Sequence, residues 1–401
     1  MKFINLPSDF SRGRKFIIIK FFVFLFIFAL VLPSVLFAQS EAPVIEQDQF
    51  FKGRVLEITG EESIDEFGQI LTHQNLRAQI KSGEEKGKEV NIINEFDPNQ
   101  SSRRLESGDY IVMGKSIIGD DISYYVSDVY RLRALWFILL FFVVLTIVFA
   151  RKQGVRAFVG LLLSFLVIIY FLIPNILSGA NPFFVATISS VLIACTALFI
   201  AHGFNVRTLI AFVSTIVTIG IAMALSQIFV YSSRLSGLGT EDAFYLQFSG
   251  DVVINLQGLL LAGIIIGTLG VLDDITTAQA AAVDEISKAN NKLGFGQLYA
   301  RGLSVGREHI VSLVNTLVLA YTGAALPLLL LFSIYEQPLW VTLNSEIILE
   351  EVMRMIIGSS ALVIAVPLTT LLAAWVFGGG GKKFVPRWFW RNSGSAQTHY
   401  H

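Results

Sequence analysis

Long apolar runs without charged residues constrain this chain more than any other feature. Of its 401 residues, 54% are hydrophobic and 15% are charged, whereas roughly a quarter of the residues in a soluble protein are charged. A helix of about 20 apolar residues crosses a hydrocarbon core about 30 Å thick. The composition therefore predicts a polytopic α-helical membrane protein rather than a soluble globular fold.

Seven such runs follow one another in the second part of the chain. They are 134–150, 157–177, 182–201, 208–230, 252–272, 310–332 and 355–377. A further run, 16–37, follows three basic residues and precedes a small-residue cleavage signal at 38–40, so residues 1–40 are expected to be a signal peptide or an uncleaved signal anchor. The expected number of spans is seven, or eight if the signal is retained.

Residues 41–130 differ in kind, because they are charged, rich in turns and built from short segments of period two. The segments are 50–58, 75–80, 89–93, 110–113 and 123–129. Five short strands separated by Gly, Asn and Asp predict a small antiparallel β domain, an OB-like or SH3-like barrel. The single cysteine, Cys195, lies in an apolar run, so this domain must fold without an intrachain disulfide.

Basic residues accumulate at one end of the predicted spans, and Lys and Arg favour the cytoplasmic side. On that side lie Arg151, Lys152, Arg156, Arg207, Lys288, Lys292, Arg301 and Arg307, and the tail 381–401 adds Lys382, Lys383, Arg387 and Arg391. The opposite loops carry only Arg234 and Arg354. The charge distribution predicts a transmembrane domain over 131–380, an extracytoplasmic domain over 41–130 and a cytoplasmic C-terminus. The net charge of −1 gives no sign of a nucleic-acid partner.

The end of the fifth run is the most distinctive stretch. Gly263, Gly267 and Gly270 form a face of small residues that suits close helix packing, although glycines also let the backbone approach an ion or substrate. Asp273 and Asp274 follow at what is expected to be the cytoplasmic end of the span. They either cap the Ala-rich helix that comes next, or hold a cation or take up protons at the mouth of a membrane path.

Other polar residues could belong to the same site. Asp284 and Glu285 lie two to three helical turns further on, and Glu308 and His309 precede the sixth run at the depth expected for Asp273. A polar collar at the interface is the alternative for Glu308 and His309, and no short ligand spacing supports a metal site. Asn315 lies inside the sixth run, where an amide binds another helix or a substrate. No catalytic constellation is present, so neither an enzyme nor a cofactor is expected.

Three stretches carry a family resemblance. They are 267–285 (GTLGVLDDITTAQAAAVDE), 306–328 (GREHIVSLVNTLVLAYTGAALPL) and 350–370 (EEVMRMIIGSSALVIAVPLTT). Over roughly residues 130–378 the chain resembles the YibE/F family of bacterial multi-pass membrane proteins. The resemblance implies the bacterial cytoplasmic membrane and a role as transporter or membrane accessory factor without an agreed substrate. The clustering of these stretches at one membrane face indicates a site formed by Asp273, Asp274, Gln279, Asp284, Glu285, Arg307, Glu308, His309 and Asn315.

Two functions fit these observations. The first is a transport protein, coupled to ions or not, with its site between the fifth, sixth and seventh runs. The second is a non-transporting scaffold or envelope assembly factor that acts through its β domain, with the basic aromatic tail 382–391 suited to anionic lipid. The expected partners are the lipid bilayer and either an envelope protein or a second copy of the chain.

Overall fold

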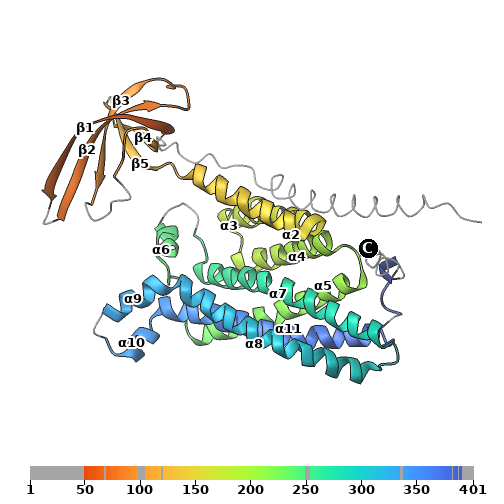
Figure 1. Cartoon of the computed structure of the whole chain (residues 1–401). Coiled ribbons are helices and arrows are strands. Elements are labelled where there is room, and N and C mark those ends of the chain that lie inside the picture. The colour runs from red at the N-terminus through yellow and green to blue at the C-terminus, as the bar shows by residue number, and fades with distance from the viewer. Residues whose placement is uncertain are drawn as a thin grey trace, which may run out of the picture. The chain divides into compact units, whose positions relative to one another are not determined.

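The computed structural model describes residues 49–66, 69–97, 104–118, 121–248, 253–334, 337–381, 383–386 and 388–390. The predicted signal segment and the tail residues Lys382, Arg387 and Arg391 lie outside the described residues. The described chain forms two compact units, of which the first ends at Phe149 and the second begins at Ala150 (Figure 1).

A closed β-barrel makes up most of the first unit. Its strands are β1 (Gln49–Glu66), β2 (Gln69–Ile80), β3 (Glu89–Phe96), β4 (Tyr110–Ile118) and β5 (Asp121–Val129). They close in the order β1-β2-β3-β5-β4, and every pairing is antiparallel except a parallel contact between Ile93 of β3 and Tyr125 of β5. All five predicted strands are confirmed, and the order fits the OB-like alternative, a partly open Greek-key barrel.

Alternating residues of the strands fill the barrel. In β3 every second side chain is buried, beginning at Val90. Two buried amides among these apolar residues satisfy each other, because Asn94 Nδ2 donates to Gln74 Oε1 at 3.2 Å. Gln74 also donates to the carbonyl of Leu105 at 2.9 Å and accepts from its N–H at 3.2 Å. This amide therefore fixes the segment before β4 to the barrel core without leaving an unpaired polar group.

The helices follow the barrel. They are α2 (Leu132–Val167), η2 (Ile168–Leu172), α3 (Ile173–Leu177), α4 (Pro182–His202), α5 (Val206–Ser232), α6 (Glu241–Phe248), α7 (Leu256–Ala289), α8 (Phe295–Ala324), α9 (Leu326–Ile334), α10 (Leu339–Leu343) and α11 (Glu346–Phe377). Helix α2 begins in the first unit and is interrupted at Arg151, whose backbone has φ 49° and ψ −128°. Within the described residues, five helices are long and apolar enough to cross a membrane, and six if α8 and α9, bent by 59°, form one span.

The predicted number of seven spans exceeds this count because of one helical stretch. The helical stretch Leu132–Leu177 is 46 residues long and contains two of the predicted runs, 134–150 and 157–177, which meet near the break at Arg151. The other five runs each fall on one helix or on the bent pair. The number of crossings therefore stays a prediction.

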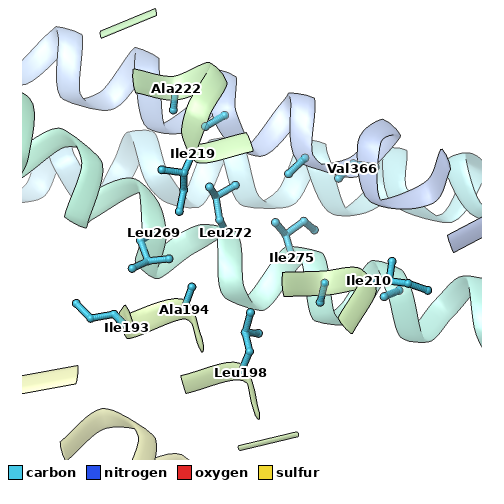
Figure 2. Packing of buried hydrophobic residues seen from close by; sticks show 14 of the residues in the cluster. Ile193, Ala194, Leu198, Ile210, Ile219, Ala222, Leu269, Leu272, Ile275 and Val366 are labelled. Atoms are coloured by element: carbon cyan, nitrogen blue, oxygen red, sulfur yellow. The ribbon is translucent and has the colours of Figure 1, made fainter. Parts of the chain in front are cut away.

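Helix α7 lies at the centre of the second unit and packs against α4, α5, α8 and α11. Figure 2 shows Leu269, Leu272 and Ile275 of α7 among side chains from the neighbouring helices. All three are at most 2% exposed, so this part of α7 is enclosed by other helices.

One expectation about α7 is wrong. Asp273 and Asp274 do not precede a separate Ala-rich helix, because α7 runs on from Leu256 to Ala289 and both acids lie in its middle. Its N-cap is Asn255, whose side chain accepts a hydrogen bond from the N–H of Gly258 at 2.9 Å. No Gly or Pro follows Asp274 before the helix ends, so nothing interrupts its backbone hydrogen bonds.

The aromatic part of the tail contacts the helices of its own unit. Phe389 is 7% exposed and its ring lies 6.5 Å from that of Phe199, while the ring of Trp388 lies 6.0 Å from that of Phe204. Among the described tail residues, these aromatic side chains cover the α4–α5 turn, so they are partly taken up by packing rather than left free for lipid.

A charged cluster on the barrel surface joins the β2–β3 turn to β4 and β5. Glu85 accepts hydrogen bonds from Lys115 Nζ and Tyr124 Oη, each at 2.5 Å, and from Lys88 Nζ at 3.0 Å. These bonds, the one from Lys115 above all, lower the pKa of the Glu85 carboxyl to about 2 from an ordinary value of 4.5.

Replacing Glu85 by Gln should destabilise the barrel in a pH-dependent way. Because the folded pKa lies below the unfolded one, the carboxylate stabilises the fold above its unfolded value of 4.5, and this contribution is lost as the pH falls towards about 2. Pulse proteolysis of the heated full-length protein should show a lower barrel midpoint for Glu85→Gln at neutral pH and no difference at about pH 2. Glu84→Gln, in the same turn, is the control and should match the parent at both pH values.

Candidate functional site

Asp273 is the member of the predicted site with the most unusual surroundings. Its Oδ1 atom is buried, and no hydrogen-bond partner for it exists among the described residues. The next residue, Asp274, is exposed on the outside of the bundle. The hydroxyls of Thr276 and Thr277 bind the backbone carbonyl of Asp273 and leave its carboxyl group free.

Asp284 and Glu285 are held in an ion-pair network at the C-terminal end of α7. Arg207 of α5 donates to both carboxylates, and Lys288 Nζ lies 2.9 Å from Asp284 Oδ2 and 3.5 Å from Glu285 Oε1. Asp284 is only 4% exposed. Removing the partner of a buried charge costs roughly 3–5 kcal/mol. These two acids therefore join α5 to α7, and their charge is compensated.

A second contact defines how α5 lies along α7. Thr215 Oγ1 and Thr276 Oγ1 share a hydrogen bond of 2.9 Å. Together with the Arg207 pairs, this contact sets an antiparallel register in which Thr218 lies at the level of Asp273. Thr218 is one turn beyond Thr215 on the same face of α5. It is fully buried, and its hydroxyl has no partner among the described residues.

Gln279 lies where three helices meet. Its Nε2 donates to the carbonyl of Gly302 on α8 at 2.8 Å and to Thr370 Oγ1 on α11 at 2.7 Å. Its Oε1 is buried and has no partner among the residues that the structure describes. Glycine allows this junction, because a Cβ at Gly306 would overlap the side chain of Val366 and lie 3.0 Å from Gln279 Oε1.

The predicted residues of α8 do not join this buried group. Arg307, Glu308, His309 and Asn315 are exposed, and within the described chain no hydrogen bond or ion pair is found for them. Because α8 runs back along α7 and Gln279 contacts its backbone at Gly302, residues 307–309, five to seven positions further on, lie nearer to the level of Asp273 than to that of Gln279. They lie near the expected depth but on the exposed side of α8.

The glycine face of α7 points away from the other helices of the bundle. A Cβ at Gly263 or Gly270 would meet no atom within 4 Å, and one at Gly267 would lie 3.5 Å from Tyr321 Oη. The predicted packing role of these glycines is therefore not fulfilled inside the described part of one chain, and it stays a prediction.

The same helices carry an apolar groove but no metal site among the described residues. Among the described residues, no group of three or more His, Cys, Asp and Glu side chains could hold a metal ion. An open apolar groove lies between α8 and α11, lined by residues such as Val314, Val318, Met355 and Val363. It contains none of the predicted site residues, and its lining suits acyl chains.

Sequence reasoning missed four residues that build this site. Arg207 was counted only as a loop charge, and nothing in the sequence pairs it with acids more than 70 positions away. Thr218 is one of several polar residues in the run 208–230, and only the register of α5 on α7 distinguishes it. Gly302 and Gly306 do carry a signal, because small residues four apart are typical of close helix contacts in membranes.

Replacing Gly306 by Ala should separate α8 from α7 and α11. The added methyl group overlaps Val366 and crowds Gln279, and such overpacking costs about 1–3 kcal/mol. The matched control is Gly296→Ala on the same helix, where a Cβ meets no atom within 4 Å and better helix propensity adds up to about 1 kcal/mol. Thermal unfolding of the purified protein should show a lower midpoint for Gly306→Ala only. Equal midpoints for the two variants would contradict the packing described.

Comparison with known proteins was made for the whole chain. No curated protein and no solved structure matches it. The model of one family, described as YibE/F-like protein, matches residues 138–379, which include every helix of the site described above. The chain therefore belongs to the YibE/F-like family.

Proposed function

We propose that this protein transports a small solute or ion across a membrane, through a path between α5, α7 and α11. The observation that carries the proposal is a set of buried polar atoms without partners in the described residues. They include Ser214 Oγ, Thr218 Oγ1, Asp273 Oδ1, Gln279 Oε1 and Thr369 Oγ1. In a bilayer, water cannot reach such atoms from the lipid, and each unsatisfied group costs several kcal/mol. A hydrated path or a bound solute supplies the missing hydrogen bonds.

The proposed topology has seven crossings. The stretch Leu132–Leu177 contains 46 residues, which at 1.5 Å per residue is about 69 Å, more than twice a hydrocarbon core of about 30 Å. Its break at Arg151 lies beside Lys152 and Arg156, so the chain turns there on the cytoplasmic side. The barrel is then extracytoplasmic and the C-terminus cytoplasmic, in the cell membrane of a bacterium.

In this topology the C-terminal end of α7 faces the cytoplasm. The network of Arg207 with Asp284 and Glu285 forms a charged rim there. The exposed Arg307, Glu308 and His309 lie on α8 between the levels of Gln279 and Asp273 and add polar groups on the outer side of that helix. Asp273 is about two turns deeper than Gln279, at the centre of the path. Asn315 contributes an amide on the outer face of α8, where a second copy of the chain could cover it.

The scaffold function has one observation in its favour. Among the described residues, β3 and β5 pair only at Ile93 and Tyr125, so this seam has the fewest backbone pairings in the closed barrel and is where an added strand from another protein would bind. Ile93 is also 53% exposed at this seam. An envelope partner would bind the barrel there, and the helices would serve as an anchor.

Flux into proteoliposomes tests the transport function. The panel consists of ions and small metabolites, and the variants are Asp273→Asn and Gln279→Leu, with Asp242→Asn on the exposed helix α6 as control. For the transported solute, Asp273→Asn should lower the rate by at least about tenfold, equivalent to roughly 1.4 kcal/mol on the barrier. The control should keep the parental rate. Equal rates for all variants would reject the proposed path.

Deleting residues 41–130 separates the two functions. The transport function predicts that the membrane-inserted remainder still moves solute, whereas the scaffold function predicts the loss of a stoichiometric crosslinked partner. Mass spectrometry of crosslinked membranes, with the full chain beside the deletion variant, identifies that partner. If the deletion removes a crosslinked partner and neither the full chain nor the deletion variant moves solute, the result favours the scaffold function.

A further inference from the structure

The charged groups around Asp273 leave its carboxyl group without a cation. On α5 the nearest basic residue is Arg207, which is taken up by Asp284 and Glu285. On α11 no charged residue follows Arg354 before the helix ends. The one charged neighbour on its own helix is Asp274, which repels rather than compensates a negative charge.

The other two helices packed on α7 offer no compensation either. The titratable residues of α4 are Cys195, which supplies no positive charge, and His202, which is exposed in the last turn of that helix and interacts electrostatically with Asp274. On α8, Arg307 and His309 lie near the level of Asp273 but are exposed, and no ion pair joins either of them to α7 among the described residues. A buried carboxylate without a counter-charge is strongly disfavoured in an apolar bundle, and uptake of a proton relieves that penalty.

The group that the register places beside Asp273 can serve both of its protonation states. The Thr218 hydroxyl donates a hydrogen bond to a carboxylate and accepts one from a carboxylic acid. A Lys or Arg at this position would hold the acid permanently in its charged form. Thr218 is fully buried and its hydroxyl is unpaired among the described residues, so it is free to bind Asp273 in either state.

A divalent cation suits this location less well than a proton. Such ions need six or more oxygen ligands, several of them charged, whereas this level of the bundle supplies one inward carboxylate and neutral hydroxyls. The described residues also contain no cluster of acids and histidines that could hold a metal.

We infer that Asp273 is a proton-binding site, with Thr218 as its positioning residue, and that transport by this protein is coupled to proton movement. The carboxylate takes up one proton from one side of the membrane and releases it to the other, and no other bond is made or broken. The coupling rests on the proposed transport function, whereas proton binding at Asp273 can be tested without it.

The test is labelling with dicyclohexylcarbodiimide, an apolar reagent that attacks protonated carboxyl groups. The full chain in proteoliposomes is labelled at a series of pH values, and fragment ions distinguish Asp273 from Asp274. Labelling at Asp273 should fall by about tenfold or more between about pH 6 and about pH 9, since the protonated fraction decreases tenfold per pH unit above the titration midpoint. Asp284 of the same helix is the internal control and should stay unlabelled, because ion pairs with Arg207 and Lys288 occupy its carboxylate.

Thr218 is tested by the pH profile. Thr218→Val removes a donor to the carboxylate, so labelling at Asp273 should persist to higher pH, whereas Thr218→Ser should restore the parental profile. An unchanged profile in Thr218→Val would remove Thr218 from the site.

Labelling in sodium chloride is compared with labelling in choline chloride to distinguish a proton from a metal cation. Equal labelling of Asp273 in both salts is expected, and weaker labelling in sodium chloride would overturn the proton assignment.

The outcomes distinguish this inference from the proposed function. Absent or pH-independent labelling at Asp273, together with flux that Asp273→Asn abolishes, rejects proton binding and leaves transport standing. Labelling with the expected pH profile, together with no flux for any solute, supports the proton site and rejects transport.

Discussion

A polar side chain on the enclosed face of α7 can find a hydrogen-bond partner only on another helix of the bundle or, for a hydroxyl such as that of Thr268, on the backbone of α7 itself. Helices α4, α5, α8 and α11 surround α7, so its inward-facing groups reach neither lipid nor bulk water. Three inward positions meet this constraint: Thr276 binds Thr215, Gln279 binds Thr370, and Asp284 binds Arg207. Because these partners come from two different helices, the same contacts that satisfy α7 also fix α5 and α11 around it.

At Asp273 the constraint is not met, because its buried carboxyl oxygen has no partner among the described residues. The paired residues on its C-terminal side lock α5 in register and so hold the fully buried Thr218 at the level of the Asp273 carboxyl group. Helix α7 therefore contains two aspartates in different settings: Asp284 is paired with basic residues, and Asp273 is not. A compensated acid stabilises a helix contact, whereas an uncompensated acid in an apolar setting changes its charge state readily. This difference is the physical basis of the proposed transport function.

Short-range pattern could be predicted from the sequence, and long-range pairing could not. The five strands could be predicted because the alternation of apolar and polar residues, as in the strands that contain Val90 and Tyr110, is a local pattern. Most spans were predicted because apolar runs are local too. The end of the fifth span was misplaced, because Asp273 and Asp274 were expected to mark the cytoplasmic surface, whereas α7 continues beyond them. The ion pairs of Arg207 and the level of Thr218 depend on how two helices lie against each other, which no local pattern encodes.

The register of α5 on α7 is the central claim, because it places Thr218 beside Asp273. Disulfide formation in a Cys195→Ser background tests it most directly, since the hydroxyl oxygens of Thr215 and Thr276 are 2.9 Å apart. In oxidised membranes the double variant Thr215→Cys/Thr276→Cys should crosslink readily, and Thr218→Cys/Thr276→Cys should not. Crosslinking of the second pair in place of the first would show that α5 is shifted along α7 by about one turn, and this would contradict the account.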